Sequence, residues 1–148
     1  QWMQRAIEVA RSARLHTSPN PWVGCVIVAG DGQVFTGATE PPGQRHAEIV
    51  ALRDAARFMG NYRLPGCELY VTLEPCVMCS GAIIHARIAR VVFGARDPKT
   101  GACGSVANLF DEPRLNFHAT VTDGVLAAEC GALLTNFFAA KRGRTETA

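Results

Sequence analysis

The stretch LYVTLEPCVMCSGAIIHA at residues 69–86 determines how the rest of the chain is interpreted. Its first five residues are rich in apolar and β-prone side chains, which is typical of a buried strand. Pro75 follows in a position that is favoured at the start of a helix, and Cys76–Ala86 are predicted to form that helix. Cys76 and Cys79 are three positions apart, so their side chains share one helix face and can hold one metal ion.

The segment His46-Ala47-Glu48 supplies the residue types that a catalytic metal site still requires. Zinc prefers tetrahedral coordination, so His46 and the two cysteines leave a fourth position open for water. Glu48 would lie beside the metal and move protons between that water, the substrate ring and the departing amine. In mid-helix His46 and Glu48 would point in opposite directions, so we expect His46 at the helix entry.

A structural zinc site and a redox pair are the alternatives for Cys76 and Cys79. A structural site requires a fourth protein ligand, and a redox pair makes no use of His46 and Glu48. The combination of H-x-E with P-C-x-x-C is the signature of zinc-dependent base deaminases. We therefore predict one catalytic zinc ion per chain, bound by His46, Cys76 and Cys79.

Predicted strands alternate with predicted helices along the 148 residues, which favours one sheet with helices on both faces. The length fits a single domain, residues 1–148. The predicted helices are 3–15, 46–59, 76–86, a short one at 105–110, and 123–142 with Asp123 as its cap. The predicted strands are 23–28, 34–37, 69–73, 90–94 and 119–122.

Composition limits the class of protein only broadly. A net charge of +2 is too small to indicate nucleic-acid binding by itself. No apolar run approaches the roughly 20 residues of a membrane helix, so we expect no membrane association and a cytoplasmic location. Four of the six cysteines stand alone in apolar or small-residue surroundings, where we expect reduced core residues.

Several runs resemble the bacterial tRNA-specific adenosine deaminases, which make inosine at the wobble position of the anticodon. Together these runs cover well over half of the chain. They are QWM at 1–3, HAEI at 46–49, NYRL at 61–64, LYVTLEPCVMC at 69–79, RVVFGARD at 90–97, KTGA at 99–102 and GVL at 124–126.

The resemblance implies the α/β fold of the cytidine deaminases, a three-layer α/β/α sandwich around a mixed sheet of about five strands. It also implies a homodimer whose partner is the tRNA anticodon loop. It assigns substrate contacts to Ala47, Asp97, Asn116 and Phe138, and nucleic-acid contacts to Lys141 and Arg142.

Residues 17–45 depart from this family. The runs TSPNPWVGCVIV at 17–28 and GATEPPG at 37–43 instead resemble the deaminase domain of riboflavin biosynthesis. In that likeness Asn20 contacts the base or its ring substituents. The adenosine family has a base-contacting Asn where this chain has Glu40.

The leading hypothesis is a hydrolytic deaminase that converts adenosine to inosine in tRNA, because the cysteines are closely spaced and the RNA-side pattern continues through Asn116. A small pyrimidine such as the riboflavin precursor diaminohydroxyphosphoribosylaminopyrimidine is the main alternative. A free nucleoside or base and single-stranded DNA are further candidates. A zinc-stabilised RNA-binding module without catalysis is an alternative of another class.

Overall fold

The computed structural model describes residues 1–12, 22–40 and 45–147, with side chains of the last helix up to residue 139. The described helices are α1 (Trp2–Ser12), α2 (Ala47–Met59), α3 (Val77–His85), the 3₁₀-helix η1 (Leu109–Asp111) and α4 (Ala127–Thr147). The strands are β1 (Gly24–Val28), β2 (Val34–Ala38), β3 (Glu68–Leu73), β4 (Arg90–Ala95) and β5 (Thr120–Thr122).

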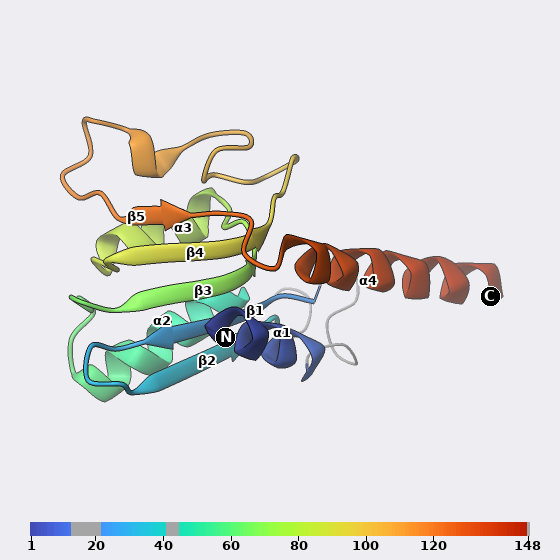
Figure 1. Ribbon diagram of the computed structural model, residues 1–148, viewed down its shortest axis with the longest axis horizontal. Helices are drawn as coiled ribbons and strands as arrows, with labels where there is room; N and C mark the ends of the chain where they lie inside the picture. Colours follow the sequence, from blue (N-terminus) through green and yellow to red (C-terminus); the bar gives the residue numbers. More distant parts are fainter. Residues whose placement is uncertain (13–21, 41–44, 148) are drawn as a thin grey trace.

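The five strands form one mixed sheet in the order β2-β1-β3-β4-β5 (Figure 1). β1 is antiparallel to both β2 and β3, whereas β3, β4 and β5 are parallel to one another. The β1–β2 hairpin turns at Gly32, whose φ of 91° suits glycine. Asp31 stabilises this turn by accepting the Gln33 N–H at 3.1 Å. The predicted mixed sheet of about five strands is confirmed.

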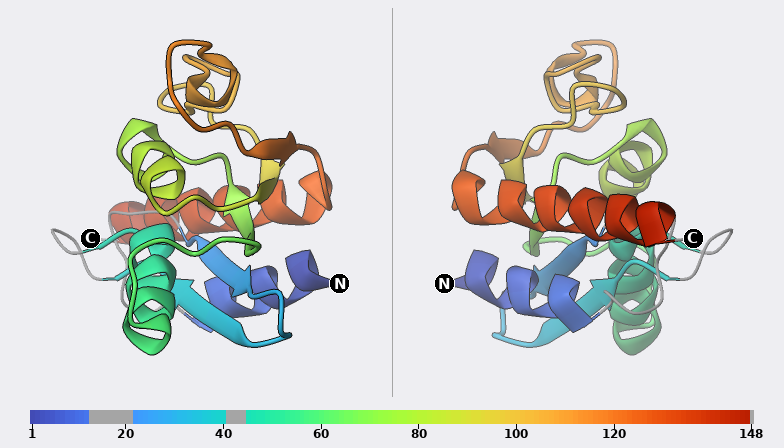
Figure 2. Two further views of the ribbon diagram at one scale, coloured as in Figure 1. Left: turned by 90° about the vertical axis from the view of Figure 1, so that its left-hand side faces the viewer. Right: turned by 90° about the vertical axis from the view of Figure 1, so that its right-hand side faces the viewer.

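Helices cover both faces of the sheet (Figure 2). Side chains alternate across each strand, so Cys25 and Ile27 of β1 pack with residues of α2 and α3. Val26, between them, packs with residues of α1 and α4 on the other face. The chain is therefore the three-layer α/β/α sandwich that the resemblance implied.

Two glycines bring helices unusually close to the sheet. A Cβ on Gly24 would lie 2.0 Å from the Ala6 oxygen of α1, and one on Gly37 would lie 2.3 Å from the Ala47 oxygen of α2. The absent side chains thus let each helix backbone contact a strand directly. At Gly37 the contact fixes the first turn of α2, next to His46.

The last predicted helix begins later than expected. It starts at Ala127 and not at Asp123, because Gly124 (φ 72°) and Leu126 (φ 53°) have left-handed backbone. Asp123 does not cap it and instead pairs with Arg96. The short helix expected at 105–110 is η1, which Asn108 caps by accepting the Phe110 N–H at 3.1 Å. The first difference involves left-handed backbone and a contact 27 positions away, and the second a local cap; periodicity reveals neither.

None of the helices in the described ranges is long and apolar enough to cross a membrane. All six cysteines are free, and the four outside the C-x-x-C pair are buried. The expectation that these four are core residues is confirmed.

Candidate active site

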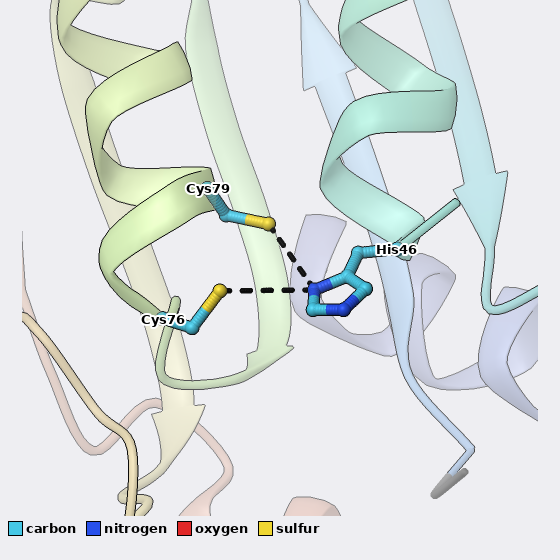
Figure 3. Close-up of side chains that lie close together, drawn as sticks. All are labelled: His46, Cys76 and Cys79. Carbon is cyan, nitrogen blue, oxygen red and sulfur yellow. Dashed lines mark hydrogen bonds between the residues drawn. The ribbon is translucent and has the colours of Figure 1, made fainter. Parts of the chain in front are cut away.

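Two helices begin side by side and bring their first residues together (Figure 3). His46 precedes α2 as its N-cap residue, with φ −68° and ψ 157°. Cys76 is the N-cap residue of α3, with φ −77° and ψ 178°. Because both backbones are extended there, the His46 imidazole is free of the helical period, and Glu48 can face the same region. The helix expected over 76–86 begins one residue later, at Val77, so Pro75 stands one position before the cap.

His46, Cys76 and Cys79 form a compact group of ligand atoms. The His46 Nδ1 atom lies 3.7 Å from the Cys76 sulfur and 3.4 Å from the Cys79 sulfur. Zinc bonds of ordinary length at a tetrahedral angle place nitrogen and sulfur about 3.6 Å apart, so the group fits zinc. Within the described part of the chain the group has three members, which is the ligand count of a catalytic site.

The two cysteines differ in acidity in the metal-free protein. A hydrogen bond from the Cys79 thiol lowers the pKa of Cys76 to about 5, and the N–H groups of Met78 and Cys79 at the helix start contribute. The same pairing and burial raise the pKa of Cys79 well above its ordinary value. The site therefore provides one thiolate before any metal binds.

Glu48 is a buried carboxyl beside this group, with 5% of its surface exposed. Burial raises its pKa to about 7, and the Cys76 charge adds to this effect. A group that titrates near neutral pH can both accept and release protons under ordinary conditions. Glu48 therefore has the acidity that general acid–base catalysis requires.

These side chains line one cavity of about 210 Å³. Its lining combines two members of the metal-binding group, His46 and Cys76, with residues at the start of α2, at the end of β3, and in the segments before β1 and after β2 and β4. The lining residues are Val23, Thr39, His46, Ala47, Glu48, Leu73, Glu74, Cys76, Asp97 and Thr100. The site thus combines three nitrogen and sulfur ligands with a titrating carboxyl beside a small cavity. This arrangement is suited to hydrolysis of a bound ring compound.

The sequence profile of the cytidine and deoxycytidylate deaminase zinc-binding region matches residues 1–95. The chain belongs to this deaminase family. A tRNA-specific adenosine deaminase from Haemophilus influenzae is 47% identical over 147 residues, covering 95% of this chain and 83% of its own. One from Bacillus subtilis is 41% identical over 152 residues, covering 99% of this chain and 92% of its own.

Solved structures of the deaminase family agree with these matches. One, from a study of A-to-I editing by tRNA:A34 deaminases at the wobble position, has a TM-score of 0.77 and 39% identity, and covers 89% of this chain and 97% of its own. A diaminohydroxyphosphoribosylaminopyrimidine deaminase/reductase from Thermotoga maritima has a TM-score of 0.75 and 36% identity. That match covers 92% of this chain but only 39% of the larger protein. The protein is therefore a hydrolytic deaminase and uses zinc, as the sequence predicted.

Two of the predicted substrate contacts, Ala47 and Asp97, line the cavity of this deaminase. The Asp97 carboxylate is engaged in its own loop, where it accepts the Thr100 hydroxyl at 2.7 Å and the Lys99 N–H at 3.0 Å. For the cavity, the backbone of Asp97 and its position in the wall are therefore as important as the charge of its carboxylate.

Two other predicted contacts within the described residues, Asn116 and Phe138, do not line the cavity. Asn116 is exposed between η1 and β5, and Phe138 is 45% exposed on α4 with its ring against Phe137. Asn20 lies outside the described residues. Lys141 and Arg142 lie on α4, beyond the last described side chain. Contacts of these residues with substrate stay predictions.

Glu74 is a site residue that the sequence reasoning missed. It is 2% exposed and lines the deaminase cavity. Burial alone would raise its pKa, but hydrogen bonds from Ser105 and from N–H groups of Asp97 and Cys103 outweigh burial and leave the pKa below its usual value. Its position directly before Pro75 and Cys76 was the sequence feature that could have indicated a place in the site.

Glu40, which replaces the base-contacting Asn of the adenosine deaminases, is engaged by Arg45. The Arg45 guanidinium donates to the two Glu40 oxygens at 2.9 and 3.1 Å. The two backbones also pair, with the Glu40 N–H donating to the Arg45 oxygen at 3.2 Å. Among the described residues that line the cavity Glu40 is not one, and its carboxylate is held by Arg45.

Proposed function

We propose that this deaminase converts adenosine to inosine at the wobble position of tRNA, with residues 1–148 acting as one domain. The observation that carries the proposal is 41–47% identity to tRNA-specific adenosine deaminases over nearly the whole chain, combined with a three-ligand group beside a cavity that the buried Glu48 carboxyl lines. In this reaction water adds at C6 of adenine, the bond from C6 to the amine breaks, and ammonia leaves.

His46, Cys76 and Cys79 would hold the zinc ion, and Glu48 would move the protons. When bound, zinc supplies Lewis acidity, which makes water a nucleophile at neutral pH. Glu48 would take the two protons of the water in turn, passing the first to the ring nitrogen and the second to the amine, which leaves as ammonia. In the metal-free protein burial raises the pKa of this carboxyl, and a carboxyl with a raised pKa is suited to act in both directions.

The anticodon loop is the proposed partner because its bases can leave their stack and enter a small cavity. Ala47 and Asp97 would then contact the base, and Asn116 and Phe138 would contact flanking nucleotides outside the cavity. Lys141 and Arg142 would contact phosphates from α4, which runs past the end of the sheet (Figure 1). This substrate also implies a cytoplasmic location.

A homodimer completes the proposal. Val77, Met78 and Val106 are exposed apolar side chains close to the metal-binding group. The two segments that carry these side chains meet at Gly101. Gly101 forms a β-bridge with Cys76, and its backbone oxygen accepts the Val106 N–H at 3.0 Å. Burial of such side chains against a second copy is the ordinary use of an exposed apolar cluster. In light scattering, Met78→Glu should shift the protein from dimer to monomer, whereas Phe58→Glu, far along α2, should not.

The substrate is tested by incubating the zinc-loaded protein with an anticodon stem-loop that carries a wobble adenosine. Inosine should form, and Glu48→Gln should lower kcat at least about 100-fold while zinc stays bound. Glu129→Gln, at an exposed position on α4, is the matched control and should retain full activity. Absence of inosine with the unmodified protein would overturn the proposal.

The aminopyrimidine ribotide of riboflavin synthesis is the second candidate. The specific observation in its favour is the likeness of residues 17–45, which include Asn20, together with the structural match to the Thermotoga maritima enzyme. A parallel incubation with this compound separates the two functions. Loss of its amine, with no inosine in the stem-loop, would assign the chain to the pyrimidine.

A further inference from the structure

Glu74 connects the metal-binding segment to a loop that forms one wall of the cavity. It follows the last residue of β3 and stands two positions before Cys76. Its Oε1 atom accepts the Asp97 N–H at 3.0 Å and the Ser105 hydroxyl. Its Oε2 atom accepts the N–H groups of Cys103 at 3.0 Å and of Ser105 at 3.1 Å. One buried carboxylate thus binds both ends of the loop 97–105.

The loop also packs directly on this carboxylate. A Cβ atom on Gly101 would lie 2.3 Å from the Glu74 Cδ atom, so no larger side chain fits between them. Next to this contact the Ala102 N–H donates to the Pro75 oxygen at 2.8 Å, and Gly101 bridges to Cys76. The loop is therefore docked on the same short segment that carries a predicted zinc ligand.

The loop gives the cavity two of its lining residues, Asp97 and Thr100. The Thr100 N–H donates to Asp97 Oδ1 at 3.2 Å, and the Gly101 N–H donates to the backbone oxygen of Asp97 at 2.9 Å. These bonds keep the loop as one unit, and the Glu74 carboxylate binds that unit at both ends, at Asp97 and at Ser105. The position of the wall relative to the metal-binding group therefore depends on Glu74.

We propose that Glu74 is a positioning residue for the deamination: it holds the loop 97–105 so that Asp97 and Thr100 face the substrate. This inference rests on the proposed function for the identity of the substrate. Glu74 itself is not one of the three predicted ligand residues. Its effect on the reaction passes through the loop, and so it should appear in substrate binding more than in proton transfer.

All four groups that bind Glu74 are donors, which makes a carboxylate necessary. In Glu74→Gln the shape is kept, but the amide NH₂ must face two of these donors in either orientation, and backbone N–H groups cannot reverse their role. Glu68→Gln is the matched control, because Glu68 begins the same strand and accepts the Tyr70 hydroxyl at 2.8 Å away from the cavity. Comparison of the two variants separates the effect of losing the contact with the loop from the effect of losing any carboxylate in or next to β3.

The experiment measures kcat and KM of the zinc-loaded variants on the anticodon stem-loop, together with zinc content and hydrogen exchange. Glu74→Gln should raise KM about tenfold or more and leave kcat within about threefold, because an unpaired buried donor displaces the wall. Amide exchange should become faster in residues 97–105 and stay unchanged in α2. Glu68→Gln should match the unmodified protein in kcat, in KM and in amide exchange.

A second variant covers the case in which Glu74→Gln does not fold. Ser105→Ala removes one donor and keeps the carboxylate, so it should raise KM about two- to fivefold with normal zinc content. A KM that equals the control, or activity lost in parallel with zinc, would overturn the inference. If the unmodified protein makes no inosine, the proposed function fails by itself, and unchanged exchange in 97–105 would then refute the role of Glu74.

Discussion

The Nδ1 atom of His46 lies 3.4 Å from the sulfur of Cys79, although 33 positions separate the two residues. The contact exists because α2 and α3 begin at the same edge of the sheet and cover the same face. A metal ion bound here joins the starts of two helices that come from separate parts of the chain. Metal binding and stability of the fold should therefore be linked.

Removal of zinc should lower the melting temperature, and the effect should require His46. Zinc at about 100 times its Kd stabilises a folded protein by about 2.7 kcal/mol, if the unfolded chain does not bind it. Thermal melts of chelator-treated protein, with and without added zinc, measure this difference. His46→Ala should remove the response, whereas His85→Ala, at an exposed position in the last turn of α3, should keep it. An equal zinc response in both variants would contradict the assigned site.

Cys76 should be the most reactive cysteine of the metal-free protein. Its pKa is lowered to about 5, so it is a thiolate at pH 7, whereas burial raises the pKa of Cys103 to about 12 and that of Cys130 to about 11. Iodoacetamide alkylation followed by peptide mass spectrometry should therefore label Cys76 first. The rate should rise with pH through about 5, since the thiolate forms above the pKa. Zinc should protect Cys76, and a midpoint near the ordinary thiol value would exclude the lowered pKa.

Gly37→Ala should weaken both the fold and the metal site. The new Cβ atom would lie 2.3 Å from the Ala47 oxygen and 2.7 Å from the Ala51 nitrogen, both in the backbone of α2, so the helix start must move. We expect a loss of about 1–3 kcal/mol in unfolding free energy, measured by urea denaturation, and weaker zinc binding. Gly81→Ala is the control: nothing lies within 4 Å of its Cβ, and a helical alanine should stabilise by about 0.5–1 kcal/mol. Unchanged zinc affinity in Gly37→Ala would show that this contact does not position His46.

Local sequence patterns were sufficient for the strands, the helices and the metal-binding group. Apolar periodicity determines the elements, and the H-x-E and C-x-x-C spacings predict which ligand types meet at two helix starts. The placement of His46 at the entry of α2 followed from the two-residue spacing to Glu48, which in mid-helix would turn the side chains apart.

Longer-range contacts could not be predicted in this way. The partners of Glu74 follow it by 23 to 31 positions, and most are backbone N–H groups, which carry no side-chain signature. The pairing of Asp123 with Arg96 spans 27 positions and moves the start of α4, while Asp123 by itself is typical of a helix cap. In both cases the partner is known only once the sheet has brought it close.

Glu40→Gln should leave base recognition nearly unchanged, although the residue stands where the adenosine family has a base-contacting Asn. Its carboxylate accepts two bonds from Arg45, at 2.9 and 3.1 Å, and does not line the cavity. A partly exposed ion pair contributes little to the stability of the fold, so its loss should leave the site in place. The value of kcat/KM on the anticodon stem-loop should therefore change by less than about fivefold. Glu48→Gln, the same chemical change eight positions later, should lower it at least about 100-fold. A large loss in Glu40→Gln would mean that Glu40 leaves Arg45 and reads the base when RNA binds.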